Sequence, residues 1–241
     1  MDLQGKRAII TGASRGIGLA VAESLASEGI KVFMTARNGG DLQRAVEGIL
    51  SRGGMAHSAP ADLGDPQEIE SAFASALKFL GGVDILINNA GINFKKPVAE
   101  LSVKEWDQIL NINLRAAFIL SKLAAAKMME QKSGYIINIG SGAAQTPIAE
   151  YTAYCASKYG LLGFSESLAL ELRSQGIKVS IILPGSTATH FGGSSPKNKL
   201  SSLPGMLAPG DIADCVLFLL RQSPQAWTSV MNLRPLNPKK S

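Results

Sequence analysis

Short apolar runs rich in β-branched residues alternate with amphipathic stretches along nearly the whole chain, and this alternation is the strongest constraint on the fold. Such runs are typical of buried strands, and apolar residues three or four apart are typical of helices. Strands are predicted over residues 7–11, 31–35, 84–88, 135–139 and 178–183, with weaker candidates at 55–60 and 229–233. Helices are predicted over residues 17–28, 41–51, 67–79, 103–130, 152–174 and 210–220. The pattern predicts an α/β fold, a doubly wound parallel sheet of about seven strands with helices on both faces.

The bulk composition predicts one soluble domain. A chain of 241 residues that is 46% hydrophobic can bury a full core, so residues 1–241 are expected to form a single domain. Cys155 and Cys215 are too few for a disulfide framework, and no charged-then-apolar leader precedes the first strand. The expected location is cytoplasmic. Charged residues interrupt each apolar run before the roughly 18 residues that a membrane span needs, so no membrane association is expected.

The positive charge has no pattern that would favour a nucleic acid. The net charge is +5 and the isoelectric point is near 9.2, but the basic residues are scattered and no stripe of aromatic and arginine side chains accompanies them. His57 and His190 have no accompanying ligand pattern, so no metal site is expected. A solvated surface is the preferred explanation of the charge, and neither a nucleic-acid site nor a metal site is predicted.

A glycine-rich loop follows the first predicted strand and opens the first predicted helix. Gly12, Gly16 and Gly18 stand there in a G-x-x-x-G-x-G pattern. Glycine lets the backbone turn tightly and approach a pyrophosphate at the helix N-terminus, where free N–H groups and the helix dipole favour anions. The alternative is a purely structural strand-to-helix turn. The flanking strand and helix favour a dinucleotide site.

The end of the second predicted strand points to the kind of dinucleotide. An acidic residue at this place binds the ribose 2′-hydroxyl of NAD, and its carboxylate would repel a 2′-phosphate. Here Ala36 takes the place, Arg37 follows, and Arg15 lies in the glycine loop. A guanidinium suits bidentate binding of phosphate. NADP(H) is therefore predicted, the alternative being two ordinary surface arginines.

Tyr154 and Lys158 offer the most concrete chemistry in the chain. Residues four apart share one face of a helix, so the Lys158 ammonium can lie close to the Tyr154 phenol. A nearby positive charge favours the phenolate, and Lys158 is therefore predicted to lower the pKa of Tyr154 from about 10. Tyr154 would then be a usable proton donor.

These residues stand in a recognisable order. Asn88-Asn89-Ala90-Gly91 closes the predicted strand at 84–88, Asn113 lies in the next helix, and Ser141 precedes Tyr154-x-x-x-Lys158. The chain resembles the short-chain dehydrogenase/reductase family from about residue 6 to residue 189. The resemblance implies a single-domain Rossmann fold and an enzyme that interconverts a carbonyl and a secondary alcohol.

The resemblance also assigns roles. The implied catalytic residues are Asn113, Ser141, Tyr154 and Lys158. Ser141 would polarise the substrate carbonyl and Tyr154 would donate the proton. Lys158 would hold the nicotinamide ribose, and Asn113 would position a water that links Lys158 to solvent. The implied cofactor-binding residues are Gly12, Ser14, Arg15, Gly16, Ile17, Gly18, Arg37, Asp62, Leu63, Asn89, Ala90, Gly91, Tyr154, Lys158, Pro184, Gly185, Thr187 and Thr189.

The substrate side is less defined. The predicted pocket residues are Phe94, Gln145, Ile148, Tyr151, His190 and Phe191, with a lid near residues 190–208. This set has no charged anchor for a carboxylate or a sugar phosphate, which favours an uncharged ketone or an acyl chain. Within the family the pattern is most similar to 3-oxoacyl-[acyl carrier protein] reductases, which makes an acyl thioester and an acyl carrier protein candidate partners.

The end of the chain departs from that pattern. Residues 232–238 read Asn-Leu-Arg-Pro-Leu-Asn-Pro where those reductases usually have a Gly-Gly-containing segment. The long helices resemble the pair that family members pack across a two-fold axis, so a homodimer or homotetramer is expected. Two other functions stay open: reduction of another small ketone or aldehyde, and a catalytically silent NADP-binding regulatory or scaffold role.

Overall fold

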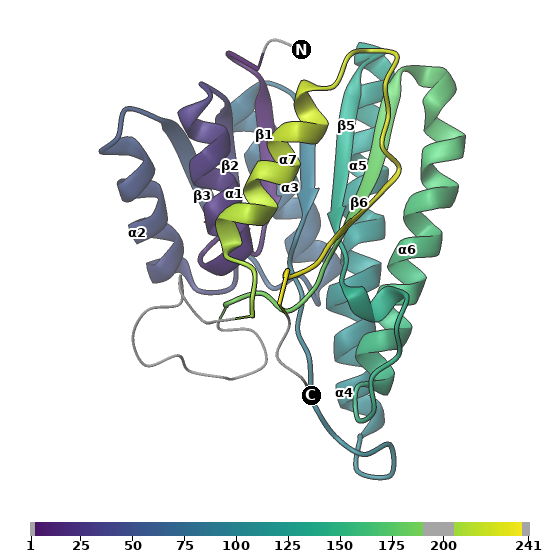
Figure 1. The fold of residues 1–241 in the computed structure, drawn as a ribbon. Coiled ribbons are helices and arrows are strands. Elements are labelled where there is room, and N and C mark those ends of the chain that lie inside the picture. Colours follow the sequence, from purple (N-terminus) through teal and green to yellow (C-terminus); the bar gives the residue numbers. More distant parts are fainter. Residues whose placement is uncertain (1–2, 190–204, 238–241) are drawn as a thin grey trace.

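All the strands in the described part of the chain belong to one parallel sheet. The computed structural model describes residues 3–189 and 205–237 (Figure 1). The sheet has the order β3-β2-β1-β4-β5-β6-β7, and each neighbouring pair is parallel. The strands are β1 (Arg7–Thr11), β2 (Lys31–Ala36), β3 (Met55–Pro60), β4 (Ile85–Asn88), β5 (Gly134–Ile139), β6 (Ile177–Pro184) and β7 (Val230–Leu233). Both weaker strand candidates, at β3 and β7, are confirmed.

Helices cover both faces of this sheet, as predicted. They are α1 (Gly16–Ser27), α2 (Gly39–Leu50), α3 (Pro66–Leu80), α4 (Val103–Leu110), α5 (Ala116–Gln131), α6 (Thr152–Leu172) and α7 (Pro209–Arg221). On one face α1, α2 and α7 pack over Ala8 and Ile10 of β1. On the other, α3, α5 and α6 pack over Ile9. Because side chains alternate along a strand, burial on both faces requires the continuous apolar runs in the sequence. The predicted single-domain doubly wound fold is confirmed.

The helix predicted over residues 103–130 is interrupted. Between α4 and α5 the backbone forms a π-helical turn over Asn111–Arg115, so the segment is not one regular α-helix. The turn contains the buried Asn113. A π turn admits one extra residue and is frequent at functional sites. Periodicity does not reveal it, because the apolar pattern continues on both sides.

The expectation that charged residues keep each apolar run too short to span a membrane is wrong for this segment. The continuous helical stretch Val103–Gln131 is long and apolar enough, by length and composition, to pass as a membrane span, and half of its most apolar part is buried inside the protein. Ala116, Leu120 and Ala124 belong to the core between α3, α5 and the sheet. Packing against the sheet therefore accounts for the apolar face of α5.

The predicted lid at residues 190–208 lies mostly outside the described residues, as do His190 and Phe191. Within the described part, Thr187 forms a β-bridge with Leu207. Ala188 N donates to Leu207 O at 2.8 Å, and Leu207 N donates to Ser186 O at 2.8 Å. The two ends of the segment are thus held side by side at the carboxyl end of β6.

The glycine loop between β1 and α1 contains positions that need glycine, among them Gly12 and Gly18. Gly12 has φ +62°, a left-handed conformation that favours glycine. At Gly18 a Cβ would press into the Gly12 carbonyl and the Asn89 side chain. Asn89 Nδ2 donates to Thr11 O at 2.9 Å and to Gly12 O at 3.2 Å. The loop is therefore packed against the end of β4, with no room for another carbon atom beneath it.

We expect Gly18→Ala to displace this loop, lower the melting temperature and weaken dinucleotide binding at least tenfold. The reason is that the clash is with backbone and with a hydrogen-bonded side chain. Gly48→Ala on α2 is the matched control, because a Cβ there meets nothing closer than 3.9 Å. It should stabilise the helix by about 0.5–1 kcal/mol. Thermal unfolding and cofactor titration measure both effects. If Gly18→Ala and Gly48→Ala had the same melting temperature and the same cofactor affinity, this description of the loop would be wrong.

Candidate active site

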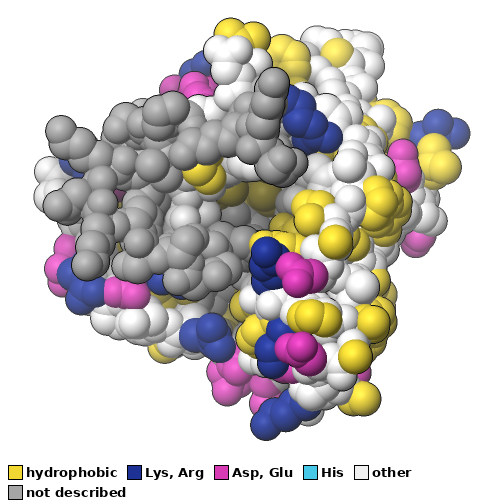
Figure 2. Space-filling view, turned by 60° about the horizontal axis from the view of Figure 1, so that its bottom comes forward, with side chains coloured by type: hydrophobic (Ala, Val, Ile, Leu, Met, Phe, Trp, Pro, Cys, Tyr) yellow, Lys and Arg dark blue, Asp and Glu magenta, His cyan; other side chains and the backbone are white. Residues whose placement is uncertain are grey.

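A cavity of about 920 Å³ lies at the carboxyl ends of the strands. It is lined by the glycine loop, the ends of β2, β4, β5 and β6, the first turns of α6, and the segment after β7. Figure 2 turns this side of the molecule toward the viewer. Parallel sheets place ligand sites here because the chain changes direction across the sheet between β1 and β4.

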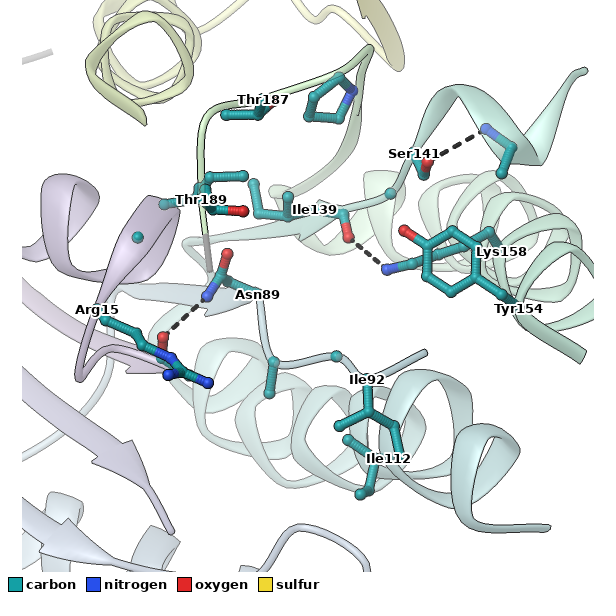
Figure 3. Close-up of a pocket in the computed structure, with 18 of the residues that line it drawn as sticks. Arg15, Asn89, Ile92, Ile112, Ile139, Ser141, Tyr154, Lys158, Thr187 and Thr189 are labelled. Atoms are coloured by element: carbon teal, nitrogen blue, oxygen red, sulfur yellow. Dashed lines mark hydrogen bonds between the residues drawn. The ribbon is translucent and has the colours of Figure 1, made fainter. Parts of the chain in front are cut away.

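Ser141, Tyr154 and Lys158 all line this cavity, as predicted (Figure 3). Ser141 follows β5 and caps a short 3₁₀ turn, where its Oγ accepts a hydrogen bond from Ala143 N at 3.1 Å. Tyr154 and Lys158 come from the first turns of α6. Lys158 Nζ lies 5.7 Å from the centre of the Tyr154 ring and donates to Ile139 O at 3.0 Å. The end of β5 therefore orients the lysine beside the tyrosine.

The predicted sign of the Tyr154 pKa shift is wrong for this structure. Burial raises the pKa of Tyr154 to about 12, and a hydrogen bond with Ser141 opposes that change. Burial also lowers the pKa of Lys158 to about 8. Removal from water disfavours the charged form of each group, and it is the largest cause of both pKa shifts. Near neutral pH the Tyr154 phenol is therefore protonated, which is the state that can donate a proton.

Asn113 does not line the cavity, although the resemblance placed it among the catalytic residues. Its Nδ2 donates to Ile92 O and to Ser157 Oγ, both at 3.0 Å, and its Oδ1 accepts from Ile92 N at 2.8 Å. The side chain thus connects the segment after β4 to α6. At Gly91 a Cβ would lie 3.4 Å from Asn113 Oδ1 and 3.8 Å from Lys158 Nζ. The glycine keeps the space between them open.

The cofactor end of the cavity is formed by the glycine loop and by the ends of β1 and β4. Thr11 Oγ1 accepts hydrogen bonds from Asn89 N at 2.9 Å and from Ala90 N at 3.0 Å. Asn89 therefore both fixes the loop by hydrogen bonds and lines the cavity. The N-terminus of α1 has no side-chain cap, and no acidic residue lies in its first turn. Its N–H groups and dipole favour an anion.

Two arginines lie at this same end. Arg15 and Arg37 both line the cavity, and neither forms an ion pair with another described residue. Asp62 Oδ1 accepts from Gly64 N at 2.8 Å, which fixes the turn after β3, and Leu63 is buried. These features fit a dinucleotide whose phosphates lie on the loop and whose adenosine carries a further phosphate.

Most of the predicted cofactor residues line the cavity. Gly18 does not, because it packs beneath the loop, and its importance is structural. Of the predicted pocket residues, Ile148 and Tyr151 line the cavity, but Phe94 and Gln145 do not. Arg234 lines the cavity and was missed. The signal that could have found it is the departure of the C-terminal segment from the Gly-Gly pattern.

The fold and the lining of the cavity together are those of a dinucleotide-dependent oxidoreductase. The family model described as short chain dehydrogenase matches residues 6–200. The chain belongs to the short-chain dehydrogenase/reductase family.

Characterised relatives cover nearly the whole chain. It is 38% identical over 233 residues to a 3-oxoacyl-[acyl-carrier-protein] reductase of Vibrio cholerae, covering 94% of this chain and 93% of the relative. It is 35% identical over 234 residues to a 2,3-dihydro-2,3-dihydroxybenzoate dehydrogenase of Bacillus subtilis, covering 90% of each. A metagenomic short-chain oxidoreductase solved in complex with NADP has a TM-score of 0.85 and 36% identity, covering 98% of this chain and 99% of the other.

The burial of Lys158 gives a pH-dependent prediction about stability. Its folded pKa is about 8, below the 10.5 of the unfolded chain, so the unfolded state binds more protons between these values. The stability of the parent must therefore rise with pH across this window, by roughly 3 kcal/mol in total. Lys158→Met removes this dependence. We compare the melting temperature of the variant minus that of the parent at two pH values. This difference should be roughly 5 °C larger at pH 7 than at pH 10.

The measurement is thermal unfolding without cofactor. Lys104→Met replaces an exposed lysine of α4 and should show the same difference from the parent at both pH values. A pH-independent difference for Lys158→Met would contradict the burial of a charged ammonium.

Proposed function

We propose that this protein is an NADP(H)-dependent oxidoreductase that interconverts a carbonyl and a secondary alcohol. The observation that carries the proposal is that Ser141, Tyr154 and Lys158 face the same cavity as the glycine loop. A proton donor, a carbonyl-binding hydroxyl and an anion site are thus within reach of one bound dinucleotide. When bound, the nicotinamide supplies the hydride to the carbonyl carbon or accepts it in the reverse direction.

The side chains of this chain perform the proton step. Tyr154 donates its hydroxyl proton to the substrate oxygen as negative charge develops there, and Ser141 Oγ donates a hydrogen bond to the same oxygen. Lys158 stabilises the phenolate that remains, since its ammonium lies over the ring. In alcohol oxidation the phenolate takes the proton back. Asn113 positions the segment after β4 and α6, and the water between it and Lys158 remains a prediction.

The choice of NADP(H) over NAD(H) is supported by charge. Ala36 leaves the end of β2 without a carboxylate, and Arg15 and Arg37 face the adenosine end of the cavity. A solved short-chain dehydrogenase of Burkholderia cenocepacia in complex with NADP is 32% identical, with a TM-score of 0.87, and covers 98% of each chain. These two lines of support are independent, since one is electrostatic and the other comes from similarity.

The relatives suggest where to look for the substrate. Those named 3-oxoacyl-[acyl-carrier-protein] reductases make 3-oxoacyl thioesters the first candidates and an acyl carrier protein the first candidate partner. The name of the Bacillus subtilis relative adds cyclic carboxylates. The cytoplasmic location remains a prediction.

We also propose that the protein is a homodimer or homotetramer. Phe118 on α5, and Tyr159 and Leu170 on α6, are about half exposed. The rings of Phe118 and Phe164 pack edge to face at 6.2 Å across the two helices. Apolar side chains gathered on adjacent helices suit a surface that a second copy covers.

Tyr154→Phe tests the proton step. It removes the hydroxyl and keeps the ring, so we expect turnover of carbonyl substrates with NADPH to fall at least 100-fold while NADPH binds as before. Tyr159→Phe, on the same helix but outside the cavity lining, is the matched control and should retain full activity, because it keeps the ring that the proposed subunit surface would use. A panel of acyl thioesters, ketones and aldehydes provides the readout. If NADPH binds but the parent oxidises it with none of them, the silent regulatory role is the better account.

Arg37→Asp tests the cofactor. The 2′-phosphate would lose a charge-assisted hydrogen bond and meet a carboxylate, so the affinity for NADPH should fall 10-fold to 100-fold, while that for NADH changes little. Arg173→Asp makes the same charge change at an exposed position in the turn between α6 and β6, and should leave both affinities unchanged. Equal weakening of NADPH and NADH by Arg37→Asp would remove this residue from the phosphate site.

A further inference from the structure

Arg234 brings a guanidinium to the substrate end of the cavity. It follows β7, and its side chain crosses the end of β6, where Nη1 donates to Leu183 O at 2.8 Å. Nη2 donates to Asn232 Oδ1 at 3.2 Å. These bonds fix the plane of the group while using two of the five N–H donors that a guanidinium offers. Arg234 does not form an ion pair with any residue in the described ranges 3–189 and 205–237.

The group lies next to the reacting residues. A Cβ on Gly142 would be 3.2 Å from Arg234 Nη1, so the guanidinium rests on the residue that directly follows Ser141. On the other side, Arg234 Cδ would lie 3.5 Å from a Cβ on Gly185, in the turn that the resemblance places beside the nicotinamide. Arg234 therefore lines the same cavity as Ser141 and Tyr154, between the residue that follows Ser141 and the turn after β6.

Arg234 lies too far across the sheet from Arg37 and the glycine loop to bind the phosphates of the cofactor. Arg37 follows β2 and Arg234 follows β7, and these strands are five positions apart in the sheet order. At about 4.8 Å per strand the separation is roughly 24 Å. The glycine loop lies after β1, which is also on the far side of β4, β5 and β6. The two ends of the cavity therefore carry separate cations.

The surroundings of Arg234 favour an anion over a neutral group. The cavity that Arg234 shares with Ser141 is also lined by Ile148, Tyr151 and Met206, whose side chains carry no formal charge. Arg234 is an exposed residue with a full positive charge and N–H donors to spare, so an anion gains a charge-assisted hydrogen bond from it that a neutral group does not. A carboxylate would accept two parallel N–H donors. This corrects the prediction that the pocket has no charged anchor.

We propose that Arg234 is a specificity-determining residue that binds a carboxylate carried by the carbonyl substrate. The substrate class is an oxo carboxylate in reduction and the corresponding hydroxy carboxylate in oxidation. The proposal rests on the proposed carbonyl chemistry and deepens it, because it names what the substrate carries besides the reacting carbonyl. It favours free oxo acids over thioesters, in which the carboxyl group is masked and neutral.

The test compares matched acids and esters. The panel contains 3-, 4- and 5-oxo carboxylates of six and ten carbons and the methyl ester of each, with NADPH. We expect the parent to have a kcat/KM at least tenfold higher for one or more acids than for their esters. In Arg234→Gln this acid should lose 10-fold to 100-fold in kcat/KM, mainly through KM, because a charge-assisted hydrogen bond is lost. The esters should change less than threefold, and Arg234→Lys should recover part of the loss.

Two readouts separate specificity from structure. Arg173→Gln removes the same charge at an exposed position distant in the fold and should leave the panel unchanged. Melting temperature and NADPH affinity establish that each Arg234 variant is folded. If Arg234→Gln lowers kcat/KM equally for acids and for esters, Arg234 only anchors the C-terminal segment, and the proposal is overturned. It is also overturned if the parent prefers the esters throughout.

A binding measurement keeps the proposal independent of turnover. The same acids and esters are titrated into NADPH-loaded Tyr154→Phe, which should bind the cofactor without consuming it, while cofactor fluorescence is followed. The proposal requires acids to bind more tightly than esters in this variant and this preference to disappear when Arg234→Gln is added to it. Absence of any preference overturns it. Absence of turnover for the whole panel and for thioesters, ketones and aldehydes, with the binding preference intact, would instead overturn the proposed carbonyl chemistry.

Discussion

The burial of the Lys158 ammonium at the end of β5 is the constraint on which the site depends. Its hydrogen bond to Ile139 O fixes the side chain beneath the cavity, and Tyr154, one helical turn earlier, is held beside it. Burial disfavours the charged form of both groups, and at neutral pH it leaves the Tyr154 phenol protonated. The proposed mechanism gives this buried cation, which lowers stability, a use: negative charge would develop on Tyr154 during reduction, and the ammonium would then have a full partner.

The sheet order separates the two recognition tasks of the cavity. Arg15 and Arg37 follow strands on one side of the reversal between β1 and β4, and Arg234 follows the last strand on the other side. Ser141 follows β5, which lies between these strands in the sheet order, and Tyr154 and Lys158 line the same cavity. A dinucleotide that spans the first half and a substrate that enters from the second meet at the end of β5. The cations at the two ends therefore do not compete for one ligand.

Sequence patterns predicted the sheet, its helices and the residues at the reacting centre because these follow from local periodicity and from motif order. The π turn at Asn111–Arg115 could not be predicted, since its apolar pattern matches an α-helix. The predicted sign of the Tyr154 pKa shift was wrong for a related reason. Spacing shows that Lys158 is near, but burial is a property of the whole fold, and here it outweighs the charge. Arg234 was missed because its contact with Gly142 joins residues 92 positions apart in the sequence.

The position of Arg234 also explains how one scaffold can change substrates. The Ser141, Tyr154 and Lys158 side chains are fixed by β5 and α6, and Asn113 joins α6 to the segment after β4, so a change in any of them disturbs several elements. Arg234 follows the last strand of the sheet, and both of its described hydrogen bonds go to β6 and β7. Among the described residues Arg234 has no hydrogen bond to Ser141, Tyr154 or Lys158, so a substitution there leaves the described hydrogen bonds of these three residues intact. Substrate choice thus lies with the C-terminal segment, and the chemistry stays with the central strands.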